Sequence, residues 1–217
     1  PSLRSAYLSA YDAARFVHGN IGGRREQILG GVILKRADGR FVVTEPVPTG
    51  PRPFAFNGLY PVDRQGIPII LHPGHSLHAR YASREALSIT DPAYVARLKW
   101  TRQEAELSAQ MFHPQDVEDL LRSGLVGYLS GAEDSLVACD LSFTHSDWRM
   151  QWMSASDNGT SVIAKKLTDG TIKPADVVRT LAESGKLRVV IGNALWGPAD
   201  FVELDWGPRA RALEFQR

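Results

Sequence analysis

Short β-rich runs separated by turn sequences constrain the fold of this chain more than any other feature. The two clearest pairs are 28–35 with 41–44, joined by Ala37-Asp38-Gly39, and 125–130 with 135–141, joined by Gly131-Ala132-Glu133-Asp134. Turn residues between two apolar runs of this length are typical of β-hairpins. The chain is therefore expected to build a sheet that contains at least two antiparallel pairs.

Helical segments alternate with these hairpins. Amphipathic spacing or helical composition predicts helices at 3–18, 94–110, 114–122 and 174–184. Gly124 and Gly185 end the last two of these helices. Further strands are expected at 67–71, 77–82, 148–152, 187–191 and 201–204. Together these elements predict an α/β (α+β) fold with a mixed, largely antiparallel sheet flanked by helices.

A change of composition near His145 indicates how the chain divides. Trp148, Met150 and Trp152 alternate there with polar residues, which is the period of a strand. A chain of 217 residues fits one domain, or one domain with a small appendage. We expect a domain at 1–144 and a C-terminal part at 145–217 that either extends the sheet or forms a small lobe.

Composition argues against several classes of protein. With 25 basic and 24 acidic residues, the net charge of +1 gives no support for a nucleic-acid or anionic-membrane partner. The single cysteine, Cys139, excludes an internal disulfide and a Cys-rich zinc site, and we interpret it as a small core residue. No apolar stretch approaches the ~18 residues of a membrane span. No signal peptide is visible, although the chain begins at Pro1, so we expect a cytoplasmic location or secretion without such a signal.

Three segments, in order along the chain, carry polar residues in a suggestive arrangement. Glu26 precedes the strand with Gly30-Gly31, Ala82-Ser83-Arg84 ends a later strand, and Asp116 follows His113 by three positions at a helix start. In this order the segments resemble the JAB/MPN (JAMM) metalloprotease-like fold, in its uncharacterised bacterial branch. That family places a glutamate before a Gly-Gly strand, a His-x-His on a later strand and Ser-x-x-Asp at a helix start. The resemblance covers about residues 10–142.

The resemblance implies a site that has lost its metal ligands. In active members two histidines and an aspartate hold zinc, and the glutamate is the general base for the bound water. Glu26 matches that glutamate and Asp116 that aspartate, while His113 replaces the serine. Ala82 and Arg84 take the two histidine positions. One protein ligand cannot hold catalytic zinc, and a guanidinium repels the ion, so we expect no cofactor.

The leading hypothesis is a catalytically degenerate bacterial protein that binds a partner protein or peptide. Tyr81, Arg84 and Trp100 are expected to line the former cleft, and the turn at 193–198 to present Trp196. The partner segment would add as a strand to a sheet edge. A simpler interpretation of Asp116 stays open, in which it is an acidic residue that complements the dipole at a helix start. Asp176 occupies the same position in a helix with no catalytic motif around it.

Two alternatives belong to other classes of function. The first is a zinc-dependent peptidase or isopeptidase whose displaced ligands come from His75, His78, His113 and Asp116, with Glu26 as base. Strand spacing places His72 and His78 on one face and His75 on the other, so this set needs a loop that brings them together. The second is a secreted effector or toxin module, because bacterial relatives of this fold occur in polymorphic toxin-like architectures.

Overall fold

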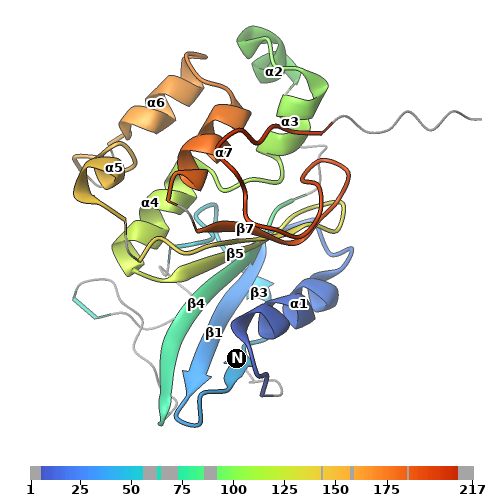
Figure 1. The fold of residues 1–217 in the computed structure, drawn as a ribbon, viewed down its shortest axis with the longest axis vertical. Helices are drawn as coiled ribbons and strands as arrows, with labels where there is room; N and C mark the ends of the chain where they lie inside the picture. The colour runs from blue at the N-terminus through green and yellow to red at the C-terminus, as the bar shows by residue number, and fades with distance from the viewer. Residues whose placement is uncertain are drawn as a thin grey trace, which may run out of the picture.

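A seven-stranded sheet lies at the centre of the fold (Figure 1). The computed structural model describes residues 6–55, 63–64, 73–85, 92–142, 144–156, 159–184 and 186–209. Its strands are β1 (Leu29–Arg36), β2 (Phe41–Val43), β3 (Val47–Pro48), β4 (His75–Ser83), β5 (Val126–Ser130), β6 (Leu136–Cys139) and β7 (Leu187–Ile191). The strand order is β2-β1-β4-β5-β6-β7, with β3 also paired to β1.

All neighbouring strands in this sheet are antiparallel except β4 and β5. The two predicted hairpins are present as β1–β2 and β5–β6. In the first, Gly39 has φ 81°, a conformation that glycine adopts without steric cost. The predicted α/β class with a mixed, mostly antiparallel sheet is confirmed. β7 pairs with β6, so the chain after residue 145 contributes a strand to the same sheet.

Seven helices lie within the described residues. They are α1 (Ala10–Ile21), α2 (Pro92–Leu98), α3 (Arg102–Ser108), α4 (Pro114–Ser123), α5 (Ser146–Met150), α6 (Val162–Thr168) and α7 (Pro174–Ala182). α1 lies on one side of the sheet, and α2 to α7 gather on the other (Figure 1). α4 ends as predicted at Gly124, which has the left-handed φ of 68°.

Residues that alternate along the strands pack on opposite faces of the sheet. Tyr128 and Ala138 belong to the apolar cluster under α1, together with Ala14 and Val17 of that helix. Their neighbours Leu129, Val137 and Cys139 belong to the larger cluster with α3, α4, α6 and α7. Cys139 is fully buried there, as expected of a small core residue. The period of two in the strands therefore divides the core into two layers.

Four predicted elements differ from the structure. α1 begins at Ala10, where Ser9 caps it, so positions 6–9 of the helix predicted at 3–18 are not helical, and positions 3–5 lie outside the described residues. The helix predicted at 94–110 is broken at Lys99, whose φ is 54°, before Thr101 caps α3. The strand predicted at 148–152 is wrong, since α5 occupies this stretch and continues into a turn. The strand at 201–204 is reduced to one bridge between Arg188 and Phe201.

Other expectations fall on residues that the structure does not describe. The strand predicted at 67–71 lies outside the described residues, and so do His72 and Gly185. In the part of the chain that is described, none of the helices has the length and apolar character needed to span a membrane.

Both outer strands of the sheet already have a short partner. Tyr7 exchanges two backbone hydrogen bonds with Phe41 of β2, at 2.6 and 2.8 Å. On β7, the Val189 N–H donates to the Asp200 carbonyl at 2.8 Å and the Val202 N–H donates to the Leu187 carbonyl at 2.9 Å. Peptide addition at β2 or β7 would have to displace these contacts, so the expected mode of binding is disfavoured there.

Candidate functional site

The carboxyl ends of the parallel strands β4 and β5 lie side by side. Ser83 pairs with Ser130 at the end of their register, and the Arg84 N–H donates to the Ser130 carbonyl oxygen at 3.0 Å. In α/β sheets, ligands bind most often at the carboxyl ends of parallel strands, since the loops that follow converge there. We therefore take this end of the β4–β5 pair as the candidate site.

Arg84 connects the end of β4 to the start of α4. Its guanidinium forms an ion pair with the Asp116 carboxylate through Nη2 and Oδ2. Arg84 Nε and Nη2 also donate to the Met111 carbonyl oxygen, at 3.3 and 3.1 Å. Only 13% of the Arg84 side chain and 4% of the Asp116 side chain are exposed. The ion pair is therefore largely shielded from water.

Asp116 has a second role as a helix cap. Its Oδ2 accepts the backbone N–H of His113 at 2.7 Å, and in α7 Asp176 accepts the N–H of Lys173 in the same way at 2.8 Å. The cation partner of Asp176 is Arg179 of its own helix, at 2.6 Å, and that pair is exposed. The capping role is thus shared by both helices, whereas the tie to a neighbouring strand distinguishes Asp116.

His113 is half-buried beside this ion pair. Its Nε2 donates to the Ser108 carbonyl oxygen at 2.5 Å, because a carbonyl oxygen can only accept. Burial lowers the pKa of His113, the charge of Arg84 lowers it further, and Asp116 and the Ser108 contact oppose this. The imidazole is therefore neutral near neutral pH.

The lowered pKa of His113 predicts a pH dependence of stability. The unfolded chain takes up a proton at the ordinary histidine pKa of 6.5, whereas the folded protein resists protonation. The free energy of unfolding is therefore expected to fall as the pH is lowered from about 7 to about 5. His113→Asn removes the titrating ring, puts a favoured N-cap residue in its place and should flatten this slope in urea titrations. His145→Asn, at the exposed cap of α5, is the control, and an equal change in both variants would contradict the assignment.

A second polar cluster lies on the other side of Ser130. The His18 ring contacts Ser130 Oγ through Nδ1 at 2.7 Å and Asp134 Oδ1 through Nε2 at 2.8 Å. Arg25 donates to Ser130 Oγ at 3.0 Å and to the Ser130 carbonyl oxygen at 2.6 Å. Arg25 can only donate and the Asp134 carboxylate can only accept, so the Ser130 oxygens accept from Arg25 and His18 Nε2 donates to Asp134.

This cluster has the residue types of a nucleophilic triad but not the access that one needs. Ser130 is 3% exposed and His18 4%, so the hydroxyl does not face solvent. Its evident effect is to fasten α1 to the β5–β6 turn, where Glu133 and Asp134 both have positive φ. No local sequence pattern predicts this contact, because Ser130 lies 112 positions from His18 in the chain.

Two of the residues expected to line the former cleft are buried. Tyr81 is 1% exposed and donates its hydroxyl to the Thr44 carbonyl oxygen at 2.6 Å. It belongs to the cluster under α1 and so lies on the opposite face of the sheet from Ala82. Trp100 is 8% exposed and packs edge-on against Tyr94. Tyr81 and Trp100 therefore do not line an open cleft, and the expectation is corrected on this point.

Glu26 and Trp196 differ in exposure from what their proposed roles suggest. Glu26 is exposed in the loop before β1, outside the buried polar contacts of Arg84 and Asp116. Trp196 is 2% exposed and stacks on Trp206, with ring centroids 5.0 Å apart. The turn at 193–198 therefore does not project Trp196 into solvent.

The displaced zinc ligand set does not converge. His75 and His78 lie at the first end of β4, where His78 packs against Phe41 with ring centroids 4.9 Å apart. Arg84 follows the other end of the strand, and six residues of extended chain separate His78 from it by about 20 Å. Because His113 and Asp116 lie at the Arg84 end, His75 and His78 cannot share one metal ion with them in this structure.

The described residues form no recognisable metal centre, and comparison with known proteins assigns no family. Among the described residues, no group of three or more histidine, cysteine, aspartate or glutamate side chains is placed to hold a metal ion. Comparisons of the chain with protein-family models, curated proteins and solved structures found no match. What the chain does must therefore be argued from its own residues.

Proposed function

We propose that this chain is a catalytically degenerate JAB/MPN-like protein that acts as a protein- or peptide-binding module. The observation that carries the first half of the proposal is the ion pair between Arg84 and Asp116. By the resemblance, Arg84 stands where the family has its second histidine and Asp116 where it has its aspartate. A guanidinium thus neutralises the carboxylate that would otherwise bind the zinc ion.

The energetics of this pair support a site that is closed to metal. Zinc at Asp116 would have to displace the guanidinium, which would leave a buried cation without its partner and cost several kcal/mol. A zinc ion would also compete with the backbone N–H of His113 for Asp116 Oδ2, which now accepts that N–H. Ala82, at the position of the first histidine, is fully buried and offers no ligand atom.

Two observations support the binding of a partner: the residues expected to line the former cleft are buried, and other apolar side chains are exposed. Tyr81 and Trp100 are core residues, so a partner must be recognised elsewhere. Several large apolar side chains on the described surface lie outside the buried core. Among them are Phe201, which is 49% exposed, and Leu204, which is 62% exposed. Contiguous apolar surface is typical of contact sites for other proteins, and Phe201 lies with Val202 and Trp206 in the lining of one hollow.

The metal content of the purified, untagged protein tests the degenerate assignment. We expect zinc far below one equivalent per chain by mass spectrometry, both as purified and after incubation with zinc and removal of the excess. Near-stoichiometric zinc that is lost in Asp116→Asn but kept in Asp176→Asn would overturn the proposal. Asp176 is the matched control because it caps α7 just as Asp116 caps α4.

A further inference from the structure

A hollow of about 340 Å³ lies beside the outer edge of β7. Val189, Trp196 and Val202 are its buried lining residues, and Phe201 and Trp206 line it from the segment that follows. The ring of Trp206 is stacked on that of Trp196. We call this the tryptophan hollow. Its volume is at the lower end of the range typical of ligand sites.

The charged residues of the tryptophan hollow are mainly acidic. Asp200, Glu203 and Asp205 line it and are exposed, and none of them forms an ion pair with a described residue. Arg209 is the one basic side chain in the lining, so three carboxylates and one guanidinium leave a net charge of −2. This local charge contrasts with the chain as a whole, which is nearly neutral at +1. A cationic ligand would find a complementary field here.

The indole N–H of Trp196 is a buried donor without an acceptor. Trp196 is 2% exposed, and its Nε1 has no hydrogen-bond partner. The Nε1 of Trp206, in contrast, donates to the Trp196 carbonyl oxygen at 3.2 Å. Trp100 and Trp152 also lack acceptors for Nε1, but Trp196 is the one that lines the hollow. Because this nitrogen is itself buried, Trp196 lines the hollow with its ring and offers no donor to a ligand.

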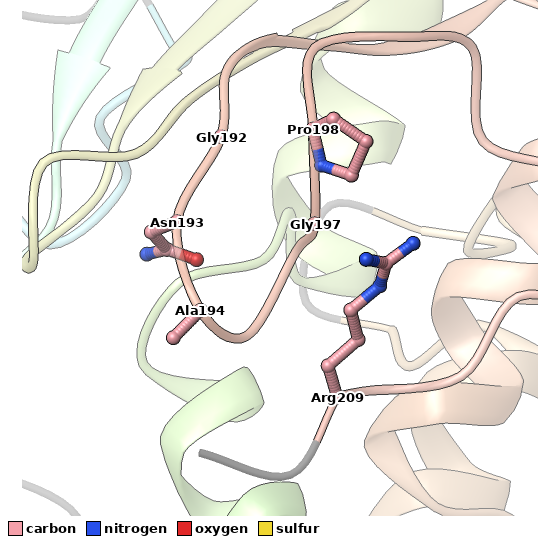
Figure 2. Close-up of a pocket in the computed structure, with 6 residues that line it drawn as sticks. All are labelled: Gly192, Asn193, Ala194, Gly197, Pro198 and Arg209. Atoms are coloured by element: carbon pink, nitrogen blue, oxygen red, sulfur yellow. The ribbon is translucent and has the colours of Figure 1, made fainter. Parts of the chain in front are cut away.

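A second, more open hollow of about 460 Å³ adjoins the first (Figure 2). It is formed by the loop 192–198, which doubles back so that Gly192 faces Gly197, and Arg209 extends its side chain toward Gly197 and Pro198. Pro198 and Arg209 line both hollows. The two hollows therefore form one stretch of surface longer than a single side chain.

We propose that the tryptophan hollow binds a basic segment of a partner protein, with a lysine or arginine side chain among Asp200, Glu203 and Asp205 and against the tryptophan pair. The inference rests on the proposed function and names the chemistry of its partner. Carboxylates and indole rings together favour a cation, through ion pairing and through the electron-rich ring face. The two adjoining hollows favour a peptide over a free amine, because together they extend beyond one side chain.

Fluorescence anisotropy with three matched labelled peptides tests this proposal. One peptide is rich in lysine and arginine, and in the other two these residues are replaced by glutamate or by glutamine. We expect the parent chain to bind the basic peptide, more weakly at higher salt, and to bind the acidic one at least about tenfold more weakly. Glu203→Gln with Asp205→Asn should weaken binding of the basic peptide about tenfold.

The control variant is Asp147→Asn with Glu183→Gln, which removes two exposed charges from α5 and from the end of α7. If both double variants lose the same affinity for the basic peptide, or if Glu203→Gln with Asp205→Asn loses none, the tryptophan hollow is not the binding site, although the chain still binds the peptide. Equal affinity for a small guanidine such as agmatine would overturn the peptide as the occupant. A parent chain that binds none of the peptides would instead overturn the binding function proposed above.

Discussion

Replacement of Arg84 by methionine is expected to lower the free energy of unfolding by about 3 kcal/mol. Methionine fills much of the same volume but leaves the Asp116 carboxylate, 4% exposed, without its cation. It also removes both donors to the Met111 carbonyl oxygen. Arg179→Met is the matched control, because Arg179 pairs with the capping aspartate of α7 on the surface. That exposed pair should contribute less than about 1 kcal/mol.

A double-mutant cycle in urea separates the ion pair from the helix cap. Asp116→Asn keeps an oxygen that can accept the His113 N–H, so it tests the charge and not the cap. Arg84→Met with Asp116→Asn should be less destabilised than the two single variants predict together, since the unpaired charge is gone. Additive losses, or an Arg84→Met loss no larger than that of Arg179→Met, would show that this pair does not hold β4 to α4.

Local sequence patterns predicted most of the fold. They failed where one spacing of residues fits both a strand and a helix. Trp148 and Trp152 are four positions apart, which satisfies both the alternation of a strand and the turn of a helix. The structure places them in and just after α5, with their rings 5.5 Å apart. The break in the helix predicted at 94–110 had a local signal, since Thr101 caps α3 by accepting the Glu104 N–H.

The candidate site was predictable only in part. Arg84 and Asp116 were singled out from motif spacing, and the structure brings them into contact. The contact of His18 with Ser130 and the stack of Trp206 on Trp196 depend on which segments the fold brings together, and no local pattern encodes that. Burial was also missed for Tyr81 and Trp100, because aromatic residues suit a binding surface and a core equally well.

Gly192→Ala is expected to have the second large effect, a loss of about 3 kcal/mol in the free energy of unfolding. A methyl group there would overlap the Gly197 carbonyl oxygen, which belongs to the facing backbone of the loop and cannot rotate away. The two arms of the loop would have to separate (Figure 2). That would break the bond from the Gly197 N–H to the Asn193 carbonyl oxygen, now 2.9 Å.

The same separation should weaken binding of the basic peptide, because this loop holds Trp196 in place. The Asn193 side chain accepts the backbone N–H of Trp196 at 2.9 Å and donates to the Gln110 side chain at 2.8 Å. A distorted loop would therefore shift the indole that lines the tryptophan hollow. Gly23→Ala, in the loop after α1, is the control, since a methyl group there meets no atom within 4 Å and Gly23 lines neither hollow. It should leave binding unchanged and alter stability by no more than about 0.5 kcal/mol. If Gly192→Ala unfolds in urea like the parent chain, the loop does not have the tight approach on which the tryptophan hollow depends.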